Sequence, residues 1–439
     1  MHGPSPQAPD PRLMPPSWYD VTSVPGSPRP RLDYVAEADA CIVGAGLAGL
    51  TLARELAGHG WSVVVLEAQA IAAGPSGRHG GFVLPGFALD QDTMERRIGF
   101  DRAKALYDLS RLGVEQVRRT IEDLRMPGVA IEPGMLNLVR SGSNVDRFRA
   151  RSEQFIRRYG PGPLFWPRER VREVLRSDRY QAGLYDGSGF HIHALNYALG
   201  LAADAVRRGV RIFEMSPATG FDMRSIRRIV STPQGAVRCN RIILCGGASL
   251  APSLHARAVS SAIPIYSHVG VTAPLGEALA DAVRFRGGLL DVRLGGDYFR
   301  VVEGGRLLWG GGVSLVPRRP KAIARSIARN IAAAFPQLRG VVVEHAWSGA
   351  MAYAPHRMPV IAEIERDLYL LAGFGGHGVN TSTVAAAILA ETLANHGKAH
   401  QHFARFGLQP SQGTLGRLAA RLRQWRRSAR EHDGDEGWR

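Results

Sequence analysis

The sequence predicts an α/β protein in which one parallel-sheet domain is built from separate parts of the chain. A second domain, with a mixed or antiparallel sheet plus helices, is inserted between those parts. Three observations support this prediction. Apolar strand-like runs followed by helical segments occur near the start, the middle and the end of the chain. The stretches between them contain a long helical segment and a series of short strands. The 439 residues also suffice for more than one domain with a large core.

The first α/β unit follows an N-terminal arm, residues 1–34, that its many prolines predict to be irregular. The apolar run 40–43 predicts a buried strand, and residues 47–56 have the spacing of a helix that ends at the glycines just beyond. Residues 63–66 predict a second buried strand. Together these segments form a βαβ unit at the start of the folded chain.

The later elements alternate between the two kinds of structure. Helices are predicted over 92–123, 193–208 and 318–334, a β-meander over 219–244, short strands over 261–316, and a strand, a Gly-rich loop and a helix over 367–397. These segments predict the domain division. The parallel-sheet domain takes 35–95, 180–255 and 345–398, the inserted domain takes 96–179 and 256–344, and a basic tail takes 399–439.

Composition excludes several classes of protein. The net charge of +16 comes from arginines dispersed along the chain without a nucleic-acid-binding motif, which favours a basic enzyme that binds no nucleic acid. No run of about 18 apolar residues predicts a membrane span, and the N-terminus lacks the apolar core of a signal peptide, so we expect a cytoplasmic protein. The three cysteines lack metal-ligand spacing, so no metal site is expected, and they are typical of a reducing compartment.

The tail contains a basic amphipathic helical pattern. Leu415, Leu418, Leu422 and Trp425 recur at three-four spacing, and six arginines between Arg417 and Arg430 fill the other face. Such a helix docks on the protein itself or on a neighbouring subunit, or makes weak contact with an anionic membrane surface.

A nucleotide-binding pattern lies inside the βαβ unit. Gly44, Gly46 and Gly49 fit G-x-G-x-x-G between the first strand and the helix, so the helix N-terminus faces a pyrophosphate. Glu67 ends the second strand, 67 − 46 = 21 positions after Gly46, where an acidic side chain accepts hydrogen bonds from ribose hydroxyls. Because a carboxylate repels a 2′-phosphate, NADP is disfavoured.

Two further Gly-rich stretches favour FAD over NAD. The second strand leads into "GPSGRHGGFV" (74–83) rather than into a regular run of βα units, and "AGFGGHGVNTST" begins the last α/β segment. Glycines let the backbone approach a flat or charged group, and the helix that follows aims its positive end at that group. A reduced flavin carries negative charge that such a helix end suits.

These residues also carry a family resemblance. "CIVGAGLAGL", "GPSGRHGG", "HIHALNYALGLA", "LDVRLGGDYFRVVEGGRLLWGGG", "WSGAMAYAPHRMPVI" and "AGFGGHGVNTS" follow one another as in the FAD-dependent D-amino-acid-oxidase-like superfamily. That superfamily includes glycine and sarcosine oxidases. The sequence most resembles the group of gamma-glutamylputrescine oxidoreductase-like proteins, over about residues 17–398.

The resemblance implies an FAD-binding Rossmann-like domain, a substrate domain on an antiparallel sheet, and oxidation of a C–N bond. Hydride passes to flavin N5, and the resulting imine hydrolyses to an aldehyde or keto acid. The cofactor positions it implies are Gly44, Gly46, Leu47, Ala48 and Gly49 at the pyrophosphate, Glu67 and Ala68 at the ribose, Ala218 at adenine, Ser76, Arg78, His79, Gly80 and Gly81 at the isoalloxazine, Gly376, His377, Gly378 and Val379 at its pyrimidine side, and Gly247 and Gly373 as further contacts.

The sequence departs from the family pattern at two histidines. His79 stands where the loop usually has Asn, and His356 replaces an acid. "WSGAMAY" has no Cys, which excludes a cysteinyl flavin, and Arg78 takes the position of a linking histidine. We therefore expect FAD to be bound non-covalently.

Candidates for the substrate side come from the strand that begins "DYFRVV". Tyr298 and Arg300 share one face, so Tyr298 predicts an aromatic wall and Arg300 an anchor for an anionic substrate group, unless Arg300 only pairs with a surface acid. His79, Trp347 and His356 complete the candidate catalytic set, and Tyr266 and His268 are weaker candidates. The expected partners are a small amine or amino acid, and oxygen or an unknown acceptor.

Two other functions remain open. One is flavin-dependent oxidation of the C–O bond of a hydroxy acid, for which His356 would supply the base. The other is a non-catalytic flavoprotein subunit, suggested by the missing acid at position 356 and the Arg-rich tail.

Overall fold

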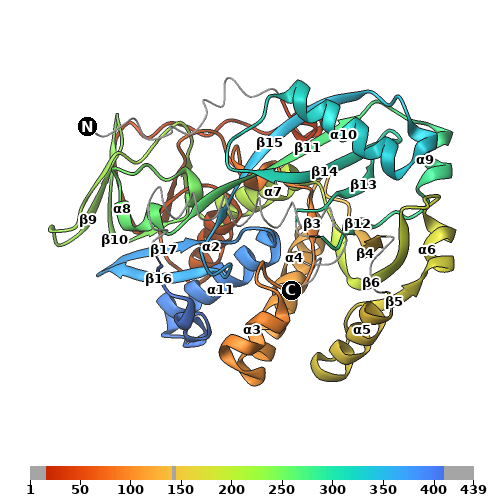
Figure 1. Cartoon of the computed structure of the whole chain (residues 1–439). Coiled ribbons are helices and arrows are strands. Elements are labelled where there is room, and N and C mark those ends of the chain that lie inside the picture. Colours follow the sequence, from red (N-terminus) through yellow and green to blue (C-terminus); the bar gives the residue numbers. More distant parts are fainter. Residues whose placement is uncertain (1–15, 141–144, 294, 410–439) are drawn as a thin grey trace, which may run out of the picture.

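The computed structural model describes residues 16–140, 145–293 and 295–409, which form two sheets with helices around them (Figure 1). The first sheet has the order β16-β17-β10-β1-β2-β7. Its parallel strands are β1 (Val35–Val43), β2 (Val63–Leu66), β7 (Arg211–Phe213), β10 (Ala236–Leu244) and β17 (Leu368–Ala372). Antiparallel strands complete it: β16 (Val360–Glu365) pairs with β17, β9 (Arg228–Ser231) with β10, and β8 (Gly220–Asp222) with β9.

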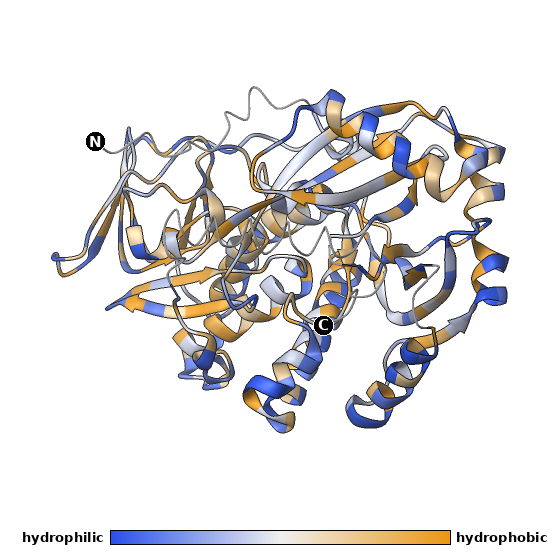
Figure 2. Cartoon of the chain, in the orientation of Figure 1, coloured by the Kyte–Doolittle hydropathy of each residue, from blue (hydrophilic) through white to orange (hydrophobic). Residues whose placement is uncertain are grey.

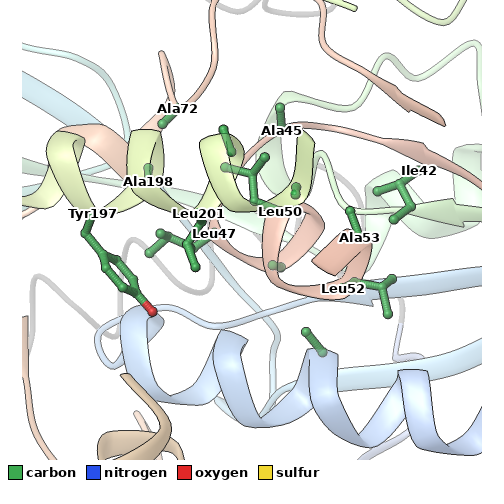
Figure 3. Close-up of a cluster of buried hydrophobic side chains, with 14 of the residues drawn as sticks. Ile42, Ala45, Leu47, Leu50, Leu52, Ala53, Ala72, Tyr197, Ala198 and Leu201 are labelled. Carbon is green, nitrogen blue, oxygen red and sulfur yellow. The ribbon is translucent and has the colours of Figure 1, made fainter. Parts of the chain in front are cut away.

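Helices α2 (Leu47–Gly58), α7 (Ala194–Arg207) and α11 (Gly378–Asn395) pack on this sheet, and α2 contacts both of the others. β2 is buried along its whole length and β10 over its last three residues, as expected for the centre of a parallel sheet covered on both faces. Ile42 of β1 packs with Leu50 of α2 and Leu201 of α7 in the main hydrophobic core (Figure 3). This core holds the start of α2 firmly against the sheet.

The second sheet is larger and mostly antiparallel, in the order β15-β11-β14-β13-β12-β4-β6-β3, with β5 beside β6. Its strands are β3 (Phe82–Val83), β4 (Glu132–Arg140), β5 (Leu164–Pro167), β6 (Tyr180–His191), β11 (Ile263–Thr272), β12 (Gly288–Asp291), β13 (Tyr298–Val302), β14 (Arg306–Ser314) and β15 (Val343–Tyr353). Among the described pairings of this second sheet, only that of β12 with β4 is parallel. This mixed sheet agrees with the predicted fold class.

The remaining helices pack around both sheets and on neighbouring helices. The helix α10 (Pro320–Ala334) packs on β15, β11 and β14. The others are α3 (Gln91–Ile98), α4 (Phe100–Leu124), α5 (Val145–Tyr159), α6 (Arg168–Val174), α8 (Ala256–Ser260) and α9 (Glu277–Ala282). Figure 2 shows mostly hydrophobic strands in the first sheet and many hydrophilic residues on α5. Within the described ranges, no helix is both long and apolar enough to cross a membrane.

Most predicted elements within the described residues are confirmed, with two corrections. The helix predicted over 92–123 is two helices, because Gly99 adopts a φ of +82° between α3 and α4. The arm is not irregular throughout, since Trp18–Thr22 forms a short helix, α1, with Tyr19 fully buried. The basic helical pattern at 415–430 lies outside the described residues, whereas residues 399–409 form short turns that bury Phe403 and Phe406.

The sheets suggest a small change to the predicted domain division. The predicted parallel-sheet domain includes β3 (Phe82–Val83), β6 (Tyr180–His191) and most of β15 (Val343–Tyr353), but all three strands belong to the second sheet. We therefore propose boundaries that follow the sheets, after β6 and after β15.

Candidate functional site

The carboxyl ends of β1, β2 and β10 meet at one edge of the first sheet. The turn at Gly44 has a φ of +113°, and a Cβ there would lie 3.0 Å from the backbone of Cys245 and Gly246, just after β10. Nucleotides bind at such an edge in open α/β sheets. Glu67, directly after β2, accepts a 2.8 Å hydrogen bond from the Ala45 amide, and burial raises its pKa. The predicted ribose and pyrophosphate positions are therefore adjacent.

The first Gly-rich loop, residues 74–81, begins beside the start of α2. Ser76 Oγ accepts a 3.0 Å hydrogen bond from the Leu47 amide, the first residue of that helix. A Cβ on Gly46 would lie 2.8 Å from the same oxygen, so only glycine fits between turn and loop. This helix end has no cap from its own side chains, which leaves its amides suited to a phosphate.

The rest of the first Gly-rich loop lies against the second sheet. A Cβ on Gly80 would be 2.7 Å from the Tyr298 ring, and one on Gly81 would be 2.9 Å from Arg300 Nη2. Trp347 Nε1 donates to the Arg78 carbonyl at 2.9 Å. Tyr298, Arg300 and Trp347 thus meet at this loop, as part of the predicted set.

The second Gly-rich loop, residues 373–378, lies against the other end of β15. The Tyr353 ring covers Gly375, with no room for a Cβ, and burial raises the Tyr353 pKa to about 12. His377 lies beside Gly86, and Gly378 begins α11. Trp347 at the first loop and Tyr353 at the second are six positions apart on one strand. Alternation therefore puts both side chains on the same face of β15.

That shared face forms a wall along both loops, which we call the loop-facing wall. In the register of β15 with β11, Ser267 lies opposite Gly349 and Ile265 opposite Met351. The Ser267 and Tyr298 hydroxyls are 3.0 Å apart, which places Tyr298 on the same wall. The wall consists of Ile265, Ser267, Tyr298, Trp347, Gly349, Met351 and Tyr353. All of these side chains are uncharged.

Several predicted substrate residues do not fit their expected roles. Arg300 is buried and donates to Gly80 O, Ile192 O, Tyr19 Oη and His191 Nδ1, which uses four of its five N–H groups and leaves no pair of donors for a two-pronged grip on an anionic substrate. His356 is buried between the Met358 amide and the Gly407 carbonyl. Trp347 is 1% exposed and braces the loop. Tyr266 and His268 lie on the opposite face of β11, where His268 binds Ser314 and Ser348.

The sequence reasoning missed part of the loop-facing wall, chiefly Tyr353, Met351 and Ser267. The even spacing of Trp347 and Tyr353 would have indicated the first two, had "AWSGAMAY" been recognised as a single strand. Ser267 could not be found in this way, because its place depends on strand pairing.

Three buried nitrogen atoms on the two loops make no hydrogen bond of normal geometry: Arg78 Nη1, His79 Nε2 and His377 Nδ1. The backbone of Ser76 near His79 and that of Leu84 near His377 act on the two rings, but their effect on each pKa is smaller than that of burial. Because His79 Nδ1 accepts from the Gly81 amide at 3.0 Å, its proton is on Nε2. Burial, with the charge of Arg300, lowers the His79 pKa to about 4, and burial lowers that of His377 to about 4. Unsatisfied buried polar atoms call for a partner. A flavin, with polar atoms along its ring edge, fits this need.

Of the other predicted cofactor residues, some lie in the main hydrophobic core and the rest lie along the first sheet. Ala48 and Val379 are buried in the main core, near the starts of α2 and α11. Ala68 is exposed beyond β2, Ala218 packs on the core of the first sheet, and Gly247 follows β10 with a φ of +54°. Among the described residues, no cluster of three or more His, Cys, Asp or Glu is placed to hold a metal ion.

Known proteins that are similar to this chain in sequence are oxidoreductases. A family model described as FAD dependent oxidoreductase matches residues 39–392. Gamma-glutamylputrescine oxidoreductase of Escherichia coli (strain K12) is 32% identical over 400 residues, covering 90% of this chain and 93% of that protein. A probable oxidoreductase, OrdL, of Haemophilus influenzae is 31% identical over 369 residues, covering 83% of this chain and 84% of that protein.

Solved structures agree in fold. Glycine oxidase from Geobacillus kaustophilus has a TM-score of 0.70 at 18% identity, covering 85% of this chain and 99% of that one. L-proline dehydrogenase from P. horikoshii has a TM-score of 0.68 at 18% identity, covering 87% of this chain and 100% of that one.

Proposed function

The chain belongs to the FAD dependent oxidoreductase family, and from this premise we propose that it oxidises the C–N bond of a small amine. The observation that supports this most directly is the pair of Gly-rich loops with unpartnered buried nitrogens beside an uncharged wall. Its E. coli relative is named for an amine substrate. The family places this chain among FAD-dependent enzymes.

The residues for the cofactor follow from the geometry. The amides at the start of α2, with Ser76, would hold the pyrophosphate, and Glu67 the ribose. His79 and His377 would meet the polar edge of the ring system with their unpartnered nitrogens. Bound FAD supplies the hydride acceptor. Arg78 stands where a histidine would be needed to form a covalent link to the flavin, so we propose that FAD is bound non-covalently.

The loop-facing wall orients the substrate and excludes water from it. Ile265 and Met351 offer apolar surface, and Tyr298 and Tyr353 offer aromatic edges with hydroxyl groups. Burial raises the pKa of Tyr298 well above its usual range, so its hydroxyl stays protonated and is no base at neutral pH. Desolvation on such a wall favours the neutral amine that hydride loss requires. No side chain on the wall is needed to remove a proton from carbon.

The same wall favours an amine without a carboxylate on the reacting carbon. Its side chains are uncharged, and four of the five N–H donors of Arg300 are engaged within the protein. Arg357, whose charge reaches Tyr353, lies in the loop after β15 rather than on the sheet. A carboxylate bound there would find hydroxyl groups but no bidentate cationic partner, which disfavours its burial. Of the expected amine and amino-acid substrates, we therefore propose an uncharged or cationic amine rather than one with the anionic group that Arg300 was expected to hold.

Two measurements test this function. The purified protein should show the visible absorption of a flavin, and denaturation with acid should release the colour into the supernatant if FAD is non-covalent. Anaerobic mixing should then bleach the flavin with primary or secondary amines. Bleaching by α-amino acids alone would overturn the substrate class but not C–N oxidation. Bleaching by hydroxy acids alone would favour C–O oxidation, and a stably coloured protein that no candidate bleaches would favour a non-catalytic subunit.

A cytoplasmic location is part of this proposal, with oxygen as one candidate electron acceptor. Cys41 and Cys239 are buried neighbours, close enough for their thiols to raise the Cys41 pKa alongside burial, yet both are free thiols. Unlinked neighbouring thiols are typical of a reducing compartment. Fractionation of cells that make the protein would test the location, and oxygen uptake during turnover would test the acceptor.

A further inference from the structure

The short helix α1 is bound tightly to the rest of the molecule. With five residues it is too short to be stable alone. Ser17 caps it through a reciprocal pair of hydrogen bonds with Asp20, and both Ser17 and Tyr19 are fully buried. Its stability must therefore come from the elements it contacts.

Asp20 connects α1 to the first Gly-rich loop. Its Oδ2 accepts a 2.7 Å hydrogen bond from the Ser17 amide and a 3.1 Å hydrogen bond from Arg78 Nη2. The Arg78 side chain is 12% exposed, and its Nε donates to the Ala73 carbonyl at 3.2 Å. One carboxylate thus fixes the helix and the arginine in the middle of the loop.

Tyr19 makes a second connection to the same loop. Its hydroxyl accepts a 3.0 Å hydrogen bond from Arg300 Nη2, and Arg300 Nε donates to the Gly80 carbonyl at 2.9 Å. The Tyr19 ring packs edge-on against Trp347, which binds the Arg78 carbonyl. The tyrosine therefore supports both side chains of the second sheet that hold the loop backbone.

Thr22 makes a third connection, to the start of α7. Its Oγ1 lies 3.0 Å from His193 Nε2, and His193 Nδ1 accepts from the Asn196 amide as the N-cap of that helix. Neighbouring side chains of α1 thus contact the loop, the second sheet and a helix of the first sheet.

We propose that α1 is a clasp that holds the first Gly-rich loop in its cofactor-binding position, with Asp20 and Tyr19 as positioning residues. The loop contains four glycines, Gly74, Gly77, Gly80 and Gly81, so its free chain has high conformational entropy. A loop ordered before binding loses less entropy when the cofactor arrives. The clasp rests on FAD binding by this loop, and not on which bond the enzyme oxidises.

Affinity for FAD in the full-length protein tests the clasp. Asp20→Asn keeps a side-chain oxygen that can accept the hydrogen bond from the Ser17 amide, but it removes the charge that faces Arg78. We expect the FAD dissociation constant to rise about tenfold, which corresponds to the loss of one charge-assisted hydrogen bond. Flavin fluorescence during titration of the apoprotein with FAD measures this constant. Tyr19→Phe should weaken binding in the same direction, and Asp20→Glu should restore it in part. The melting temperature of the apoprotein should change little in Asp20→Asn.

Controls separate positioning from general stability. Glu115→Gln removes an exposed ion pair with Arg119 on α4 and should leave FAD affinity unchanged. In a double-mutant cycle with Arg78→Gln, the losses of Asp20→Asn and Arg78→Gln should be less than additive, because both break one contact. Unchanged FAD affinity in Asp20→Asn and Tyr19→Phe, or a loss fully matched by apoprotein melting, would overturn the clasp. Failure of the wild type to bind FAD would instead overturn the proposed function.

Discussion

Arg300 donates a 2.8 Å hydrogen bond to Nδ1 of His191, and His191 Nε2 in turn donates to the Arg286 carbonyl. The histidine is therefore neutral, and the other acceptors of Arg300 are two backbone carbonyls and a tyrosine hydroxyl. Within the described part of the chain, this buried guanidinium has no carboxylate partner. A buried cation without a counter-ion is costly, which suggests that the site uses the charge.

The first prediction concerns the reduction potential of bound flavin. A positive charge behind the first Gly-rich loop stabilises an anionic reduced flavin more than the neutral oxidised form. Arg300→Gln should therefore make the potential more negative, by about 30 mV for about 1.4 kcal/mol in a two-electron couple. Spectroelectrochemistry with a reference dye measures this shift. Arg300→Lys keeps the charge and should retain most of the potential, while equal shifts in both variants would contradict the electrostatic role.

The second prediction concerns His79 and pH. Its pKa of about 4, lowered by burial and by Arg300, keeps the ring neutral above pH 6. His79→Asn should therefore leave the pH profile of flavin reduction unchanged between pH 6 and pH 9, while altering FAD affinity through the lost Nε2–H. Stopped-flow reduction at several pH values checks this. An apparent pKa that disappears in the variant would show instead that His79 titrates during turnover.

The third prediction compares two glycines of the same loop. Gly81 has a φ of +84°, and a Cβ there would clash with the Ile192 carbonyl. Gly81→Ala should lower the free energy of unfolding by about 3 kcal/mol and weaken FAD binding. Gly74 has a φ of −77° and open space around it, so Gly74→Ala should be nearly neutral. Chemical denaturation of both variants provides the test, and similar losses would refute the steric argument.

The fourth prediction is loss of stability in acid. Burial lowers the pKa of His79, His193, His268 and His377 from 6.5 to about 4. Between pH 6.5 and pH 4 the unfolded chain binds more protons than the folded one, so stability falls as the pH falls. The apoprotein melting temperature should be highest above pH 6.5 and decline steeply towards pH 4. His268→Gln should make the decline shallower, and a flat profile in the wild type would contradict the assignment.

The cofactor side of the site was largely predictable because it depends on local sequence. A tight turn between a buried strand and a helix requires glycine at Gly44 and Gly46, and the strand that follows fixes where Glu67 lies. Burial of both faces also marks the parallel strands as continuous apolar runs. The glycine turn, the acidic residue after the second strand and the apolar strands can each be recognised from a few tens of consecutive residues.

The substrate side was less predictable because it depends on pairing between distant strands. Alternation placed Tyr298 and Arg300 on one face correctly, but it could not show that Arg300 would be surrounded by acceptors from Tyr19 and Ile192. The same limit concealed the role of the residues "SWYD", whose partners lie far along the chain. Segments with no periodic pattern give no hint of the surface that will cover them.

The contacts of α1 also constrain when the enzyme can mature. Tyr19 pairs with Arg300 across 281 positions, and Thr22 pairs with His193 across 171. Docking of α1 must therefore wait until most of the chain has been made and β13 has joined its sheet. Newly made protein would pass through a stage in which α1 is not yet docked against the first Gly-rich loop. Acquisition of the flavin would then mark the end of folding rather than its beginning.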